Sequence, residues 1–455
     1  MNNAATGVKS SLVFFILLIV FSSFFKINAQ NNSQNDTSTS FTLGQCIEYA
    51  LKHQPALQQS LINIDIAKVT NSINLSGWLP QAGVSGNLTH YLELPTSFVS
   101  NSGGQQQKQK AGVVNTFIPS LSVTQAIFSP SLLYASKSAS LYVQQAEQVT
   151  DSTKIFLVSI VSKSFYNLLL TLEQIDVLKE DTARLNKNLS DTYHQYIAGT
   201  VDETDYDEAA ISLNNSKAQL KQASENITPQ YALLKQVMGF PPDKQFNVSF
   251  DTLRMMNDIS FDTTQQLQYE KRIEYQQLQT AKKLQSQLTS YYKNAFLPSV
   301  SAFFNYTPEF ENNSFPSLFG SAYPYSYVGL SLSIPIFTGF ARLENVHRSK
   351  LQEKFLDWDE IGLRSQIYSE YTSALANYKS NLYNLEAMRD NEEKAKRVYG
   401  IVTLQYSQGV VAYLNVITAE SNLISSEIGY INALFQLLSS KIDLEKAMGF
   451  ITYNR

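Results

Sequence analysis

The chain has 455 residues, 44% of them hydrophobic and 16% charged, with one Cys and four scattered His residues. The charged fraction lies well below the ~25% that is usual for soluble domains. The net charge of -4 argues against a basic nucleic-acid-binding protein. A single Cys excludes a disulfide framework and a cysteine-based metal cage. At this length we expect two domains or one duplicated unit.

The N-terminus has the pattern of a secretory signal. Lys9 precedes the apolar run Leu12–Phe25, and small or tolerated residues follow at 27–29. The run is shorter than the ~20 residues that a membrane-spanning helix needs. We therefore predict a signal peptide at residues 1–29, with an uncleaved anchor as the alternative. Cys46 lies far from this run, so we expect a small buried apolar residue there rather than a lipidated N-terminus.

Long helices are predicted from the placement of helix breakers. Proline is absent between Ser131 and Thr228 and again after Pro335. A proline in a helix interior costs ~3 kcal/mol and a glycine ~1 kcal/mol, so stretches that lack both favour helices. The predicted helices are Glu48–Trp78, Ser131–Ala198, Asp202–Met238, Gln265–Phe296, Phe340–Gln408 and Ala412–Met448.

Two regions between these helices alternate apolar and polar residues, at about 81–128 and about 299–337. Period-2 alternation predicts strands with two unlike faces, so each region is expected to be a pair of strands around a polar loop. Five tyrosines near the loop ends resemble the aromatic girdles of outer-membrane barrels. A soluble hairpin with core tyrosines is the alternative. The tyrosines are Tyr91, Tyr306, Tyr323, Tyr325 and Tyr327.

The sequence consists of two copies of one unit. Leu79-Pro80 and Leu121–Phe128 are matched by Leu297-Pro298 and Leu330–Phe337, at offsets of 218 and 209. Tyr196–Gly199 and Met238–Phe240 are matched by Tyr406–Gly409 and Met448–Phe450, both at an offset of 210. We therefore predict a first repeat at residues 30–240, a linker at 241–264 and a second repeat at 265–455.

Each repeat also contains a seven-residue apolar pattern, which favours coiled-coil packing. The positions are Leu213, Leu220, Ile227 and Leu234, then Leu423, Tyr430, Leu437 and Leu444. The helix Ser131–Ala198 would be roughly 100 Å long at ~1.5 Å per residue, and its two neighbours together match its length. We therefore predict that two short helices flank each long one, with tips at Gly199 and Gly409. Pro229 inside a short helix is expected to mark a kink.

Strands that enter a membrane must close into a barrel, because lipid cannot satisfy a free edge. Four strands per chain cannot close, since about eight are the practical minimum. If the hairpins enter lipid, the protein is therefore an oligomer whose helices cross the periplasm.

The whole mature chain resembles the TolC family of outer-membrane efflux and secretion channels. The resemblance rests on the paired Leu-Pro strand starts, the strand ends at Phe128 and Phe337, the Tyr-x-x-Gly tips and the Met-Gly-Phe ends. It implies a mainly α fold with a membrane β-barrel part, formed by a homotrimer with a twelve-stranded β-barrel and a twelve-helix α-barrel. It also implies an outer-membrane location, a periplasmic adaptor (membrane fusion) protein and an inner-membrane pump as partners.

The resemblance further implies a gate at the periplasmic tip. The candidate gate residues are Thr204, Asp205, Tyr406, Asn415, Thr418 and Asp202. Thr204 and Asp205 match the Thr-Asp pair of the family, and Tyr406 matches its gate tyrosine. Asn415 and Thr418 stand where the family has two aspartates, and Val411 stands where it has an arginine. A solvated, acid-rich helix start would explain Asp202 and Asp205 equally well.

The tips are also the expected docking sites for the adaptor, because exposed apolar residues there are typical of interfaces. The candidates are Gly199, Thr200, Val201, Gly409, Val410 and Val411. Simple turn formation is the alternative role of the glycines.

Motifs for catalysis or for nucleotide binding are not found in the sequence. Glu344 and His347 have the spacing of a di-iron ligand pair, but without a second copy we expect a solvated helix face. We predict no enzymatic activity and no cofactor. The predicted function is a passive exit duct of a tripartite efflux pump or type I secretion system, with a soluble periplasmic coiled-coil scaffold or adaptor as the alternative.

Overall fold

The structure is a computed structural model that describes residues 40–100, 104, 106–250 and 259–451. The predicted signal peptide, residues 1–29, lies outside the described residues. The chain divides into two compact units, and the larger one comprises Phe41–Lys244 and Val248–Arg455. All arrangements described below lie within this larger unit.

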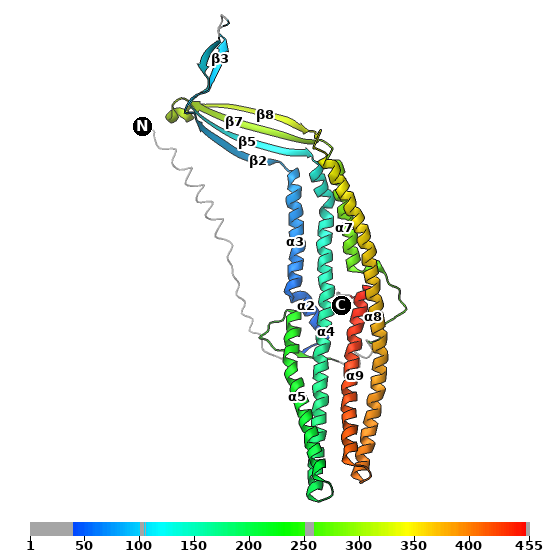
Figure 1. The fold of residues 1–455 in the computed structure, drawn as a ribbon. Coiled ribbons are helices and arrows are strands. Elements are labelled where there is room, and N and C mark those ends of the chain that lie inside the picture. Colours follow the sequence, from blue (N-terminus) through cyan, green and yellow to red (C-terminus); the bar gives the residue numbers. More distant parts are fainter. Residues whose placement is uncertain (1–39, 101–103, 105, 251–258, 452–455) are drawn as a thin grey trace, which may run out of the picture. The chain divides into compact units, whose positions relative to one another are not determined.

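Long helices dominate the unit, as the breaker pattern predicts (Figure 1). The helices are α2 (Leu43–His53), α3 (Pro55–Leu75), α4 (Pro130–Ile197), α5 (Glu203–Met238), α7 (Ile273–Asn294), α8 (Ala341–Ser407) and α9 (Tyr413–Met448). Short 3-10 helices are η1 (Ser76–Trp78), η2 (Tyr269–Lys271) and η3 (Phe315–Gly320). The strands are β1 (Ser40–Phe41), β2 (Gln81–His90), β3 (Thr96–Ser100), β4 (Gln106–Lys110), β5 (Asn115–Phe128), β6 (Asn247–Val248), β7 (Ser299–Asn312) and β8 (Ala322–Ser333).

Two predicted helices differ from the observed ones. The helix expected at Glu48–Trp78 begins earlier, at Leu43, and breaks at Gln54, where an extended residue caps α2 and Pro55 opens α3. Proline suits the first turn of a helix but not its interior. The helix expected from Gln265 begins only at Ile273. The preceding Arg272 is extended and buried, and its guanidinium donates to the carbonyl oxygen of Ala447 at 3.0 Å.

Each long helix is flanked along its length by shorter ones, as predicted (Figure 1). Helix α4 packs against α3 and α7 near the sheet and against α5 and α9 toward the tips. Helix α8 packs against α7 and then α9. The helices therefore follow the order α3-α4-α7-α8 near the sheet and α5-α4-α9-α8 near the tips.

The predicted heptad positions contribute to these contacts. Leu213, Leu234, Leu423, Leu437 and Leu444 are buried, and the other three positions are half-buried. Pro229 lies inside α5 without ending it. Cys46 is fully buried and burial raises its pKa to about 12, as expected of a small core residue.

One window of α4 is long and apolar enough to cross a membrane by length and composition alone. Buried residues make up 56% of that window, and the buried side chains of α4 include Val161, Phe165 and Leu168. Such burial is expected of a core helix, so this window is weak evidence for a membrane span.

Strands from both repeats join in one antiparallel sheet with the order β2-β5-β7-β8 (Figure 1). The first strand region contains more than a simple hairpin, because β3 and β4 form a second ribbon between β2 and β5. The last strand ends at Ser333 rather than near 337, ahead of Pro335, which cannot donate a ladder hydrogen bond.

The register of this sheet separates its side chains onto an apolar and a mainly polar face. Directly opposed residues share a face, as Val84, Leu121 and Tyr306 do across β2, β5 and β7. The apolar face also carries Leu88, Val123, Phe304, Val328, Leu330 and Leu332. The polar face carries Ser85, Asn87, Ser120, Ser122, Asn305 and Thr307.

Three of the expected girdle tyrosines lie on the polar face. Tyr325 and Tyr327 oppose Thr307 and Asn305, and Tyr323 lies on the same face of β8. Barrel girdles face lipid, so the girdle interpretation is wrong for these three. Of the five tyrosines, Tyr306 lies on the apolar face and Tyr91 lies just beyond β2.

Candidate functional site

Both tips of the helical pairs are built in the same way. Gly199 and Gly409 each have a φ of 70°, a conformation that glycine adopts without strain. The amide of the following residue, Thr200 or Val410, donates to the carbonyl oxygen five residues earlier at 3.0 or 2.9 Å. This is the hydrogen bond of a Schellman motif, so the repeated Tyr-x-x-Gly pattern encodes a helix end.

All six predicted docking residues lie on these two turns. Gly199, Thr200, Gly409 and Val410 are exposed, and Val410 has 69% of its surface accessible. Val201 and Val411 are half-buried. The two tips therefore present small and apolar groups to their surroundings.

Tyr406, the predicted gate tyrosine, links the two helical pairs. Its hydroxyl donates to Oε1 of Gln195 on α4 at 2.7 Å, and its ring lies 5.3 Å from that of Tyr413. Burial raises the pKa of Tyr406, and the negative charge of Asp205 contributes. The structure thus brings the predicted Tyr406 and Asp205 into electrostatic contact.

The other predicted gate residues are less engaged. Asp202 is the N-cap residue of α5, and its carbonyl oxygen accepts from the amide of Asp205 at 3.2 Å. Thr204, Asn415 and Thr418 are exposed. The Thr418 hydroxyl donates to a carbonyl oxygen of its own helix.

An apolar cluster holds the four helices together directly above the tips. Its buried members are Ala209 of α5 and Tyr413 and Val416 of α9. Half-buried side chains from α4, α8 and α9 pack against them, namely Leu189, Tyr399, Val402, Tyr406 and Ile417. The cluster therefore couples the two tips within one chain.

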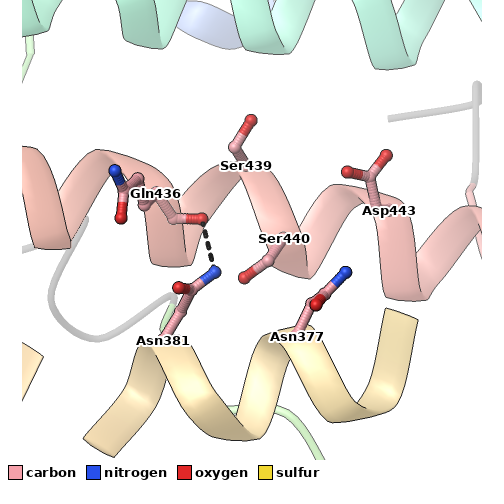
Figure 2. A pocket seen from close by; sticks show the side chains of 6 residues that line it. All are labelled: Asn377, Asn381, Gln436, Ser439, Ser440 and Asp443. Atoms are coloured by element: carbon pink, nitrogen blue, oxygen red, sulfur yellow. Dashed lines mark hydrogen bonds between the residues drawn. The ribbon is translucent and has the colours of Figure 1, made fainter. Parts of the chain in front are cut away.

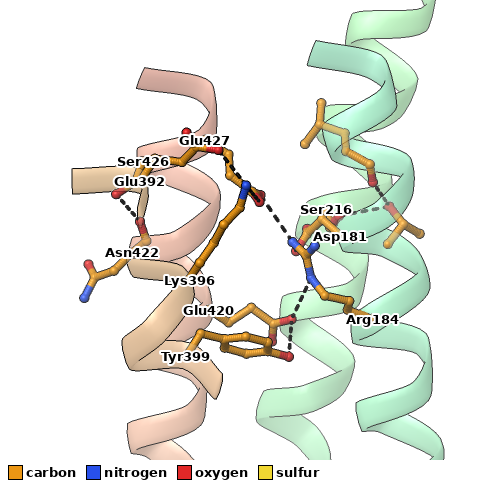
Figure 3. Close-up of polar contacts among 12 residues, drawn as sticks. Asp181, Arg184, Ser216, Glu392, Lys396, Tyr399, Glu420, Asn422, Ser426 and Glu427 are labelled. Carbon is orange, nitrogen blue, oxygen red and sulfur yellow. Dashed lines mark hydrogen bonds and ion pairs between the residues drawn. The ribbon is translucent and has the colours of Figure 1, made fainter. Parts of the chain in front are cut away.

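A buried group of charges follows one to two helical turns farther from the tips (Figure 3). Arg184 of α4 lies 3.4 Å from Asp181, 4.0 Å from Glu420 and 3.5 Å from Glu427. Lys396 of α8 lies 3.8 Å from Glu427 on the other side. Glu427 of α9 is therefore held between cations from α4 and α8, whereas Glu420 faces the cation from α4.

Glu420 also accepts hydrogen bonds from Asn188 at 3.1 Å and from the Tyr399 hydroxyl at 3.5 Å. Its side chain is only 3% exposed. Burial, and next the nearby Asp181 charge, raise the pKa of Glu420 to about 7. Burial also raises the pKa values of Asp181 and Glu427. Three buried acids face one half-buried arginine, and burial brings the pKa of Glu420 to about 7, so the charge state of this group depends on pH near neutrality.

No local sequence pattern predicted this charge group. One signal was present, because Glu420 and Glu427 are seven residues apart and lie three residues before the heptad positions Leu423 and Tyr430. Acids next to a buried seam indicate a polar cluster only if a cation faces them. The facing Arg184 lies more than 200 residues earlier in the chain, and only the fold brings it there.

Other parts of the surface offer little chemistry. A shallow recess between α8 and α9 is lined by polar side chains only, as Figure 2 shows: Asn377, Asn381, Gln436, Ser439, Ser440 and Asp443. Within the part of the chain that the structure describes, no cluster of three or more His, Cys, Asp or Glu could hold a metal ion. Glu344 and His347 are both exposed, as expected of a solvated helix face.

A sheet with one apolar and one polar face, carried by long helical pairs with exposed tips, is the architecture that the resemblance to outer-membrane channels implies. The chain belongs to the outer membrane efflux protein family, whose model matches residues 46–240 and 277–450. This confirms the resemblance to TolC-type channels. The protein is therefore an outer-membrane efflux protein.

Solved structures have the same fold. VceC, an outer membrane protein of Vibrio cholerae, is 16% identical with a TM-score of 0.71, covering 90% of this chain and 96% of VceC. The CmeC outer membrane channel of Campylobacter jejuni is 19% identical with a TM-score of 0.69, covering 93% and 91%. The open state of the MtrE channel of Neisseria gonorrhoeae is 18% identical with a TM-score of 0.71, covering 92% and 94%. The curated proteins gave no match.

Proposed function

We propose that the protein works as a homotrimeric, passive exit duct. The proposal rests on one observation: the sheet and the helices next to it have their outermost elements on the same two sides of the chain. The sheet ends in β2 on one side and β8 on the other, and the helices near it end in α3 and α8. Open strand edges are not tolerated in lipid, so β8 of one copy pairs with β2 of the next.

Apolar rows on the two outer helices support the same contact. Residues Ile62, Ile66, Val69 and Ile73 form one row on α3, and Leu351, Phe355, Trp358 and Ile361 form another on α8. Each of these eight side chains is more than half exposed in the single chain. The spacing of four and three residues is that of a coiled-coil seam. Unlike surfaces that meet head to tail generate a ring if the rotation closes.

The number of copies follows from the resemblance to the family, in which three chains supply twelve strands. The test is the native mass of the protein extracted from outer membranes in mild detergent. We expect a heat-sensitive species of three chains. A monomer in the soluble periplasmic fraction would instead favour the scaffold or adaptor and would overturn the duct.

The proposed partners are a periplasmic adaptor and an inner-membrane pump, which supplies the energy because we propose no enzymatic activity for the chain itself. The cargo would be small toxic compounds or polypeptides. The exposed Val410 is central to the proposed docking surface. We expect Val410→Asp to abolish efflux while trimers persist, and Val410→Ile to retain both. Efflux that survives in the aspartate variant would contradict docking at this tip.

We also propose that Tyr406 keeps the tip closed, together with Asp205, Thr204, Asp202, Asn415 and Thr418 around it. Tyr406→Phe removes the hydroxyl that binds Gln195, so a larger single-channel conductance in lipid bilayers is expected. Tyr383→Phe is the matched control, because it also removes a hydroxyl from α8 but the Tyr383 side chain is 75% exposed and lies far from the tip. Equal conductance of both variants and the wild type would exclude this role of Tyr406.

A further inference from the structure

The polar face of the sheet carries a column of aromatic rings. Tyr323, Tyr325 and Tyr327 alternate along β8, each about half exposed. The rings of Tyr325 and Tyr327 are stacked at 6.5 Å, and Phe303 of β7 meets Tyr327 edge-on at 6.0 Å. We call these four residues the aromatic column.

Strand β7 determines how the rings of this column pack and places a carboxylate beside it. Phe303 opposes Gly329, and a Cβ atom at residue 329 would lie 2.6 Å from the Phe303 ring. The glycine therefore lets the Phe303 ring lie across β8 beside Tyr327. Glu309 opposes Tyr323 at the other end of the column.

The charged side chains on the polar face of the sheet are all negative. In the four strands of the sheet, the charged residues are Glu309 and Glu311, and both lie on the polar face. These strands contain no lysine or arginine. Aromatic rings attract cations through their negative π-faces and stack on other rings, and a nearby carboxylate adds to the attraction.

We propose that the aromatic column is a weak binding track for aromatic cations inside the duct. This inference rests on the proposed function, because it needs the polar face to line the lumen of a closed barrel. Weak sites in series suit a duct, since cargo that binds tightly would not leave. An aromatic anion would meet the same rings but would be repelled by Glu309 and Glu311.

The test is equilibrium binding of tetraphenylphosphonium to the detergent-extracted oligomer, measured by calorimetry. Tetraethylammonium, which has no rings, serves as the comparison cation. Replacement of two tyrosines in Tyr325→Ser/Tyr327→Ser is expected to weaken tetraphenylphosphonium binding about tenfold, at roughly threefold for each lost cation–π contact. The variant Tyr325→Phe/Tyr327→Phe keeps the rings and is expected to bind within about twofold of the wild type.

Tyr306→Leu, on the opposite face of β7, is the control for altered sheet stability and is expected to leave the affinity unchanged. Unchanged binding in the serine variant, or equal losses in the serine and phenylalanine variants, would overturn the track. The native mass of each protein is measured in parallel. Wild type that is not oligomeric refutes the duct, whereas a normal oligomer with unchanged binding refutes only the track.

The tyrosines lie on an edge strand, so the serine variant can fail by disturbing the contact between copies. Glu309 lies on the inner strand β7, away from the contact between copies, so a variant at this residue tests the track in that case. We expect Glu309→Gln to assemble normally and to weaken tetraphenylphosphonium binding about threefold or more. Unchanged affinity of this variant would overturn the track.

Discussion

At the residue scale, the buried Glu420 is the group most sensitive to pH. Its pKa rises from 4.5, the ordinary value of a glutamate, to about 7, because it is buried beside Asp181. Between these two values the folded state binds more protons than the unfolded state. The contribution of Glu420 to stability is therefore fully present below pH 4.5 and is lost as the pH rises through about 7. Asp181 and Glu427 are shifted in the same direction.

This shift predicts pH-dependent opening of the contact between α4 and α9. We expect amide exchange in residues 413–427, corrected for its intrinsic rate, to be at least ~10-fold faster at pH 8 than at pH 5.5, which equals ~1.4 kcal/mol. Glu420→Gln keeps the hydrogen-bonding shape without the charge and should remove most of this difference. Glu393→Gln, at an exposed pair with Arg397, is the control and should change nothing. A pH dependence that persists in Glu420→Gln would contradict this account.

A second residue-scale feature explains the repeated Met-Gly-Phe. Gly239 and Gly449 both have positive φ, and a Cβ atom at either would lie 2.7 Å from a backbone oxygen, of His53 or Lys271. Gly239 therefore lets the end of α5 pack against the end of α2. Gly449 likewise lets the end of α9 pack against the residues that precede α7. Few sequence motifs have so direct a steric reason.

Gly449→Ala is accordingly expected to destabilise the protein by about 2 kcal/mol or more, from left-handed strain and the steric clash together. The measurement is the temperature at which the oligomer dissociates in detergent. Gly400→Ala is the control inside α8, away from the proposed contact between copies, where a Cβ atom meets nothing within 4 Å. There we expect a gain of up to ~1 kcal/mol from helix propensity. Similar temperatures for both variants would refute the steric argument.

At the element scale, α5 carries a proline that its neighbours tolerate. Pro229 is exposed and lies inside the helix Glu203–Met238. It has no amide hydrogen to donate to the carbonyl oxygen of Glu225, and its ring crowds that oxygen. Packing against α4 therefore maintains the helix despite a local cost.

Pro229→Ala is expected to restore this hydrogen bond and to stabilise the protein by up to ~3 kcal/mol. The dissociation temperature of the oligomer again measures the effect. Asn226→Ala, on an exposed turn of the same helix, is the control for propensity alone and should gain less than ~1 kcal/mol. A loss of stability in Pro229→Ala would mean that the curvature at Pro229 is itself needed for packing.

At the scale of the whole molecule, the proposed ring brings β2 of one copy beside β8 of the next. The double variant Ser85→Cys/Ser331→Cys places one thiol on each outer strand. Within one chain these strands are about 14 Å apart, at three strand spacings of ~4.8 Å, so a shorter thiol reagent joins only different copies. We expect covalent dimers and trimers after treatment. The native Cys46 is fully buried and does not compete.

The matched control pairs Ser85→Cys with Ser301→Cys on the inner strand β7. With a reagent shorter than about 9 Å, this pair should give no products of higher mass, because β7 lies two strand spacings of ~4.8 Å from β2 of the neighbouring copy. Equal cross-linking in both pairs would show that β2 and β8 are not the surfaces that meet. The control tests the arrangement of copies independently of any transport assay.

The sequence by itself determined the features that depend on near neighbours in the chain. Proline and glycine placement predicted the long helices, because breakers act through local backbone strain. The duplicated tips and Met-Gly-Phe ends predicted two equivalent halves, since each is a local helix-end motif. Pro55 also marks a helix break within the sequence, so the single helix predicted at Glu48–Trp78 was wrong there.

Only the tertiary structure decided which distant segments meet. The β5–β7 pairing joins the two repeats in one sheet, and its register places Tyr323, Tyr325 and Tyr327 on the polar face. Likewise, Arg184 acquires its partners Glu420 and Glu427 from the other half of the chain. An alternating apolar pattern predicts a strand with two unlike faces, and a heptad pattern predicts a helix with two unlike faces. The choice of neighbour for each face depends on long-range packing, which no local pattern encodes.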